Sequence, residues 1–152
     1  MVPYEPAVRV PLILTPPGGS DHRVVHGLVE HLDVAATIRD IAGAGGHPTF
    51  EGRSLLGWAN SGEGVSRVAV FSESFGFGMV RTSSHKLVFG EETHGPVQLF
   101  DLDDDPHEDT NLLLTGNSAH LCDRLMKDVV WPFLALGPVR LGSPSFGQRL
   151  RI

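Results

Sequence analysis

Cysteine is almost missing from this chain: its 152 residues contain a single one, Cys122. One cysteine excludes an intramolecular disulfide framework and a zinc site built from several thiolates. Cys122 lies in Leu121-Cys-Asp-Arg-Leu125, a stretch typical of a helix and without a neighbour that stabilises a thiolate. We therefore interpret it as a small apolar core residue, and the count leaves the cellular compartment open.

Basic residues are also few, with 12 Lys and Arg against 18 Asp and Glu, and they are scattered. Without a basic stripe to neutralise phosphates, we expect no nucleic-acid partner. No apolar run approaches the roughly 20 residues that span a bilayer, so we expect no membrane partner. What the chain does contain is 41% hydrophobic residues, enough for a sizeable core.

The first part of the chain predicts a strand followed by a helix. Residues 8–14 are rich in branched side chains and are followed by Pro16-Pro-Gly-Gly19, which favours a buried strand and a tight loop. A helix is predicted over 33–43, with Asp33 as its N-cap and Gly43 as its stop signal. Its apolar face consists of Val34, Ala35, Ile38 and Ile41. Residues 43–64 are rich in glycine and predict an irregular connection with one helical turn.

The second part predicts a small antiparallel sheet covered by a helix. Four short segments have strand character: 67–72, 78–82, 85–89 and 97–102. Their short connections favour a meander. A helix over 117–131 follows, capped at Asn117-Ser118 and interrupted by Pro132. The apolar stripe expected to cover the sheet consists of Leu121, Cys122, Leu125, Met126 and Val129.

An acidic segment, Val97-Gln-Leu-Phe-Asp-Leu-Asp-Asp-Asp-Pro-His-Glu-Asp-Thr-Asn-Leu112, invites a calcium hypothesis. Counted from Asp101, however, Pro106 stands where a calcium loop needs glycine, and Leu112 stands where it needs glutamate. We predict instead that Asp101 and Asp105 accept hydrogen bonds from nearby backbone amides and that Asn111 anchors the loop. No metal site is predicted in this chain.

This acidic segment and Tyr4-Glu-Pro-Ala-Val-Arg-Val-Pro-Leu12 together resemble the C-terminal portion of a sulfatase of the alkaline-phosphatase superfamily. Asp33 and Thr37, and the loop Gly52-Arg-Ser-Leu55, match further segments of that family in the same order. The resemblance implies an α+β chain that is a fragment of an alkaline-phosphatase-like α/β fold. Residues 1–64 would be the edge of the large α/β domain, and residues 65–152 the small C-terminal subdomain with its sheet, the 117–131 helix and a tail.

The resemblance also implies which catalytic groups this chain lacks. Sulfatases use a formylglycine made within Cys/Ser-x-Pro/Ala-x-Arg, together with a calcium ion, and no such motif occurs here. We therefore predict no catalytic residue and no cofactor in this chain, with calcium and formylglycine implied for the intact parent. In the family the loops of the small subdomain commonly contribute to the substrate pocket. This gives a hypothesis for substrate contact by Glu73, Arg81 and His85, beside the alternative of ordinary sheet-surface residues.

The sequence thus predicts a C-terminal fragment of a sulfuric ester hydrolase that is inactive alone. One alternative is a fragment of a phosphonate or phosphate ester hydrolase of the same superfamily. The other is a standalone interaction module derived from such an enzyme. Because a strand cut from a large sheet leaves unpaired edges, the expected partners are a second copy of the chain or the missing N-terminal catalytic part.

Overall fold

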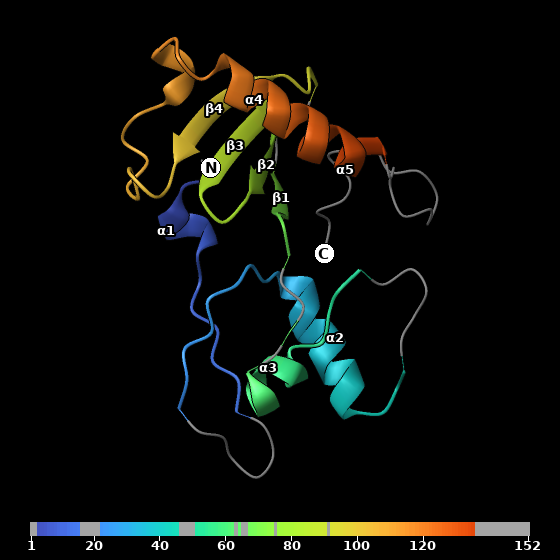
Figure 1. Cartoon of the computed structure of the whole chain (residues 1–152). Coiled ribbons are helices and arrows are strands. Elements are labelled where there is room, and N and C mark those ends of the chain that lie inside the picture. The colour runs from blue at the N-terminus through green and yellow to red at the C-terminus, as the bar shows by residue number, and fades with distance from the viewer. Residues whose placement is uncertain are drawn as a thin grey trace. The chain divides into compact units, whose positions relative to one another are not determined.

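The computed structural model describes residues 3–15, 22–45, 51–62, 64, 67–74, 76–90 and 92–135. These residues form two compact units (Figure 1). The sheet unit combines the residues up to Val10 with those from Ala69 onward, and the helix unit is Pro11–Val68. The N-terminal residues therefore belong with the sheet although the whole helix unit separates them from it in the chain. The assignment of residues 1–64 to the edge of a larger domain stays a prediction.

The sheet unit contains four antiparallel strands in the order β1-β2-β3-β4. They are β1 (Val70–Ser74), β2 (Phe77–Arg81), β3 (His85–Gly90) and β4 (Pro96–Asp101). The register pairs Arg81 of β2 with Lys86 of β3, and Lys86 with Phe100 of β4. The predicted meander is confirmed, with its first two strands displaced by a few residues from the expected ranges.

A continuous helical run covers one face of this sheet (Figure 1). It consists of α4 (Ala119–Leu125), the π-helical turn η2 (Met126–Val130) and α5 (Trp131–Ala135). The prediction that Pro132 interrupts the helix is wrong. The wide π turn comes just before Pro132, and such a turn makes room for a ring that would otherwise clash with the carbonyl four residues earlier. Ser118 is the N-cap residue, as predicted, but its hydroxyl donates to the carbonyl oxygen of Leu112 at 2.7 Å.

The apolar core lies between this helical run and the sheet. From the strands it contains Val80, Leu87, Phe89 and Leu99, and from the helices Cys122, Leu125, Met126 and Val130. Leu121 and Val129 of the predicted stripe pack at its margin, and Phe71 of β1 stacks on Phe133 of α5 with 3.7 Å between ring centroids. Cys122 is 5% exposed, and burial raises the pKa of its thiol, which agrees with the predicted core role.

The helix unit contains α2 (His31–Ile41) and α3 (Leu56–Ser61). The prediction of Asp33 as N-cap is wrong by one turn: Glu30 is the N-cap, and Asp33 is the third helical residue, whose carboxylate accepts from the Glu30 amide at 2.9 Å. The predicted stop at Gly43 is confirmed. Gly43 has φ +64°, and the amides of Gly43 and Ala44 donate to the carbonyls of Asp40 and Arg39, which satisfies the last turn.

The strand predicted over 8–14 is not formed. The short helix α1 (Glu5–Val8) ends there, and residues 9–14 carry neither helix nor strand. A strand needs a neighbour to accept and donate its ladder hydrogen bonds. The described residues provide none at this position. No helix among them is long and apolar enough to cross a bilayer. The tail expected beyond residue 135 lies outside the described residues.

Phe89→Ala tests whether the core under the helical run holds the sheet unit together. Phe89 is 0% exposed, so we expect a loss of roughly 3–5 kcal/mol in the free energy of unfolding. Urea denaturation followed by circular dichroism measures this change. The matched control is Leu114→Ala: Leu114 is 84% exposed, and its truncation should change the stability by less than about 0.5 kcal/mol. Equal stabilities of the two variants would contradict this core assignment.

Candidate functional site

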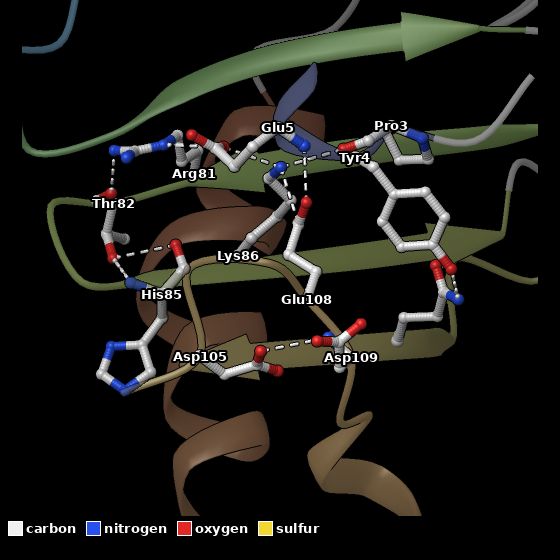
Figure 2. Close-up of polar contacts among 11 residues, drawn as sticks. Pro3, Tyr4, Glu5, Arg81, Thr82, His85, Lys86, Asp105, Glu108 and Asp109 are labelled. Atoms are coloured by element: carbon white, nitrogen blue, oxygen red, sulfur yellow. Dashed lines mark hydrogen bonds and ion pairs between the residues drawn. The ribbon is translucent and has the colours of Figure 1, made fainter. Parts of the chain in front are cut away.

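Lys86 is a fully buried lysine, with 0% of its surface exposed. Its ammonium group lies 2.8 Å from Glu5 Oε1 and 2.7 Å from Glu108 Oε1, and it donates to the carbonyl oxygen of Pro3 at 3.0 Å. Glu5 Oε1 also accepts from Arg81 Nε at 3.1 Å. We call Glu5, Arg81, Lys86 and Glu108 the Lys86 network; Figure 2 shows how they converge. Two cations and two carboxylates balance, so the buried charge of Lys86 is paired with opposite charge.

Strand register explains why Arg81 and Lys86 meet. They are cross-strand partners, so their side chains leave the sheet on the same face, opposite to the one that packs on the helices. Glu5 reaches that face from α1. The aromatic ring of Tyr4 completes the arrangement: it packs edge-on against Phe100 at 5.9 Å, and its hydroxyl accepts from Gln98 Nε2 at 3.2 Å. Residues 3–5 are therefore fixed on the sheet by charge, hydrogen bonds and ring packing.

The acidic turn delivers Glu108 to the network. Asp101 Oδ1 accepts from the Asp103 amide at 3.0 Å, and the two oxygens of Asp105 accept from Asp109 N at 3.1 Å and Thr110 N at 2.8 Å. These backbone hydrogen bonds, first among them that of Thr110, lower the pKa of Asp105. The predicted structural role of both aspartates is confirmed.

Asn111 closes the same loop onto β4, as predicted. Its Oδ1 accepts from the amides of Leu99 and Leu113, both at 3.1 Å, and its Nδ2 donates to the carbonyl oxygen of Val97 at 3.3 Å. The turn it closes holds Glu108 at φ +60°, a left-handed conformation that is uncommon outside glycine. Glu108 is 5% exposed, and its second carboxylate oxygen accepts from the Glu5 backbone amide. The turn thus serves to direct one carboxylate beneath the N-terminal segment.

The pKa of Glu5 reflects this arrangement. Burial raises it, but hydrogen bonds from Lys86 and Arg81 outweigh burial, so the pKa lies below its ordinary value of 4.5. Glu5 therefore stays ionised throughout the neutral range, and its negative charge stabilises the buried Lys86.

A second polar cluster lies in the helix unit. Asp33 is 1% exposed and accepts from the Arg53 amide at 2.7 Å and from the guanidinium of Arg67. Thr37, 3% exposed, accepts from the Leu55 amide at 2.9 Å. Burial raises the pKa of Asp33, but the hydrogen bonds from Arg67 and from the backbone lower it below the usual value. The cluster joins the two segments 33–37 and 52–55, which the sequence resemblance treats as separate motifs.

The three residues predicted to contact substrate do not converge. Arg81 lies on the sheet face of the Lys86 network, whereas Glu73 and His85 alternate onto the helix-covered face. Glu73 is the cross-strand partner of Gly78, whereas His85 lies opposite Thr82. Gly78 and Thr82 are four residues apart on the same stretch of chain, so Glu73 and His85 are separated by roughly 13 Å along the sheet. His85 hydrogen-bonds Ser84 Oγ through Nδ1 at 2.8 Å. Substrate contact by these three residues stays a prediction.

Sequence reasoning missed Lys86 and Glu108. The signal for Lys86 was its position inside the apolar strand His-Lys-Leu-Val-Phe, whose residues 86–89 are all buried, so the lysine cannot reach solvent. A lysine in such a strand requires a carboxylate partner. For Glu108 no local signal distinguished it from the neighbouring acidic residues, because only the backbone turn selects it.

The described residues do not fit a catalytic calcium or formylglycine site. Among them, no three His, Cys, Asp or Glu side chains are grouped so that they could hold a metal ion. The carboxylates of Asp101 and Asp105 are already engaged by backbone amides. Cys122 is enclosed in the apolar core. In the described residues the buried charged side chains therefore form ion pairs with one another.

Comparison with solved structures gives the same fold. A protein solved in complex with its substrate D-glucosamine-2-N,6-O-disulfate superimposes with a TM-score of 0.54 at 18% identity, over 72% of this chain and 25% of that one. A sulf-designated Bacteroides thetaiotaomicron protein, solved in connection with the metabolism of multiple glycosaminoglycans, gives a TM-score of 0.56 at 17% identity, over 79% and 31%. At these identities the likeness shows the fold alone.

Two curated relatives are arylsulfatases. Arylsulfatase K of Mus musculus is 32% identical over 123 residues, which make up 72% of this chain and 22% of that protein. An arylsulfatase of Clostridium perfringens is 29% identical over 140 residues, or 85% of this chain and 28% of that protein. The chain spans about a quarter of the length of these relatives. Fold and relatives together define its class, the C-terminal portion of a sulfatase.

The family follows from a third comparison. Residues 1–131 match the family described as N-sulphoglucosamine sulphohydrolase, C-terminal. Because the match covers most of the chain, the chain belongs to this family, and the predicted resemblance and fold class are confirmed. Both segments joined by the Lys86 network, residues 3–5 and the acidic turn, lie inside the match.

Lys86→Met tests the network. The substitution leaves two buried carboxylates without their shared cation, so we expect a loss of about 3–5 kcal/mol in the free energy of unfolding. Lys86→Met/Glu108→Gln removes one cation and one carboxylate, leaves Glu5 paired with Arg81, and should recover most of that loss. The matched control is Lys127→Met on the exposed face of the helical run. Urea unfolding measures all three variants, and a Lys86→Met midpoint equal to that of the control would contradict the assignment.

The pH dependence of stability tests Glu5. Its pKa is depressed in the folded chain, so its contribution is fully present above the ordinary value of 4.5 and is lost as the pH falls through the folded value. The difference in unfolding free energy between wild type and Glu5→Gln should therefore be constant from pH 7 to about 5 and shrink below about 4.5. The control, Glu92→Gln, changes an exposed carboxylate between β3 and β4. A wild-type advantage over Glu5→Gln that grows on acidification would refute the depressed pKa.

Proposed function

We propose that this chain is the C-terminal scaffold of a sulfuric ester hydrolase and that it does not hydrolyse sulfate esters by itself. The observation that carries the proposal is the Lys86 network, which uses every one of its charges to join residues 3–5 to the acidic turn. A catalytic lysine must present its charge to a substrate. Lys86 is instead closed off by three acceptors from its own chain.

Sulfate-ester cleavage requires a nucleophile in line with the leaving group and positive charge on the non-bridging oxygens. The chain contains no Cys/Ser-x-Pro/Ala-x-Arg motif, and its described carboxylates form no metal site. The proposal therefore assigns the formylglycine and the calcium ion to the remaining part of a longer sulfatase. This chain contributes a folded C-terminal part on which that catalytic part packs.

Sulfate esters are the substrate class that the relatives favour. Both curated relatives are called arylsulfatases, and the family is named after a sulphohydrolase. No observation points to phosphonate or phosphate esters. The three predicted substrate contacts do not form one pocket, so they do not indicate a particular sugar or aryl group.

The proposal predicts the activity of a chimera. In the Clostridium perfringens arylsulfatase, the region that matches this chain is replaced by the whole chain. We expect calcium-dependent hydrolysis of 4-nitrophenyl sulfate within about tenfold of the intact relative, which is ~1.4 kcal/mol in the barrier. The chain alone, at the same concentration with calcium, should give no turnover above the buffer blank. Turnover by the pure chain, or a chimera that unfolds cooperatively but is inactive, would overturn the proposal.

A further inference from the structure

Residues 3–5 lie across the sheet face that is opposite to the helical run, and we call them the strap (Figure 2). The carbonyl oxygen of Pro3 accepts from Lys86 at 3.0 Å. The Glu5 carboxylate pairs with the same ammonium group at 2.8 Å, and the Glu5 amide donates to the carboxylate of Glu108. Each of these partners is distant in the chain. The place of the strap on the sheet therefore depends on these contacts and not on its neighbours in sequence.

The chain that follows the strap does not hold it in place. After α1, residues 9–13 belong to neither a helix nor a strand, and they are exposed. Val10 and Ile13, for example, are 56% and 89% exposed. A segment with few buried contacts opens at a lower free energy than the core of the same domain. Release of the strap therefore breaks no other described element.

Ionised carboxylates hold the strap on the sheet. The groups that face Glu5 are Arg81 from β2, Lys86 from β3 and Glu108 from the acidic turn, while β4 contributes the uncharged Gln98 and Phe100 beside Tyr4. Protonation of Glu5 removes the carboxylate that Lys86 and Arg81 share. Lys86 would then be a fully buried cation with Glu108 as its remaining anionic partner. Access of water relieves the cost of such a buried charge, so protonation favours an open strap.

The direction of the pH effect follows from the environment of Glu5. Burial raises its pKa, but hydrogen bonds from Lys86 and Arg81 outweigh burial and keep the pKa below the ordinary value of 4.5. The closed strap therefore favours ionised Glu5. Its hold is complete above pH 4.5 and is lost as the pH falls through the lower value of the closed state. The buried cluster under the helical run includes no carboxylate, so this protonation does not act on it.

We propose that the strap is an acid-released device: protonation of Glu5 frees residues 3–5 from the sheet and admits water to Lys86, while the sheet and the helical run stay folded. The closed and open states differ in one surface, the sheet face around Lys86 and Phe100. The device is independent of the proposed function, because all of its groups belong to this chain.

Fluorine NMR of the whole chain tests the release. Tyr4 is the only tyrosine, so fluorotyrosine gives one signal that reports on the strap. We expect this signal to move from its native position to its position in urea with a midpoint below pH 4.5. At that midpoint the fluorotryptophan signal of Trp131 in α5, assigned with Trp131→Phe, should keep its native position. A common midpoint for the two signals, or a Tyr4 signal that stays native at about pH 3, would refute acid release.

Amine acetylation at neutral pH tests the access of solvent to Lys86. The chain has two lysines, and the exposed Lys127 serves as the internal reference in mass spectrometry. Glu5→Gln imitates the protonated carboxyl group, so we expect it to raise the acetylation of Lys86 relative to Lys127 at least about tenfold over wild type. The native Trp131 signal verifies that the variant is folded. The matched control, Glu92→Gln, should leave the ratio unchanged, and equal protection of Lys86 in Glu5→Gln and wild type would contradict the device.

Discussion

The sheet unit depends on the pairing of a single buried ammonium group, that of Lys86. Removing it from water carries a large desolvation cost, which only close and complete pairing can offset. It pairs with the carboxylates of Glu5 and Glu108 and donates a hydrogen bond to the Pro3 carbonyl oxygen, so its partners come from three different places in the chain. Each acceptor must be held in position by its own surroundings. The α1 segment, the acidic turn and the strand register therefore form one interdependent arrangement.

This arrangement gives the sheet two unlike faces. One is the apolar contact with the helical run, and the other combines the Lys86 network with Met79, Val88 and Phe100, which are 3%, 3% and 1% exposed. The strands β2 and β3 are consequently buried on both sides, which is unusual for a four-stranded antiparallel sheet with one helical layer.

The sequence was informative where local chemistry decides the outcome. In the acidic segment, backbone amides close in sequence donate to the short polar side chains of Asp101, Asp105 and Asn111. The four strands were predictable because clear turn residues separate them. The sequence was misleading where the structure of a segment depends on a partner that is distant in the chain. The strand expected over 8–14 depends on a neighbour that the described chain does not offer. Lys86 and Glu108 escaped notice because their pairing crosses many residues of chain.

The sheet unit is made from two stretches that lie far apart in the chain. Lys86 and Pro3 are separated by 83 positions, and Glu5 and Glu108 by 103. Ribosomal synthesis produces the N-terminal stretch first, yet its place on the sheet exists only after β3 and the acidic turn have been made. Contacts of such long separation close late because the intervening chain loses entropy when its ends meet. We therefore expect the hairpins to pair first and residues 3–5 to join the sheet last, although residues 3–5 come first in this stretch of chain.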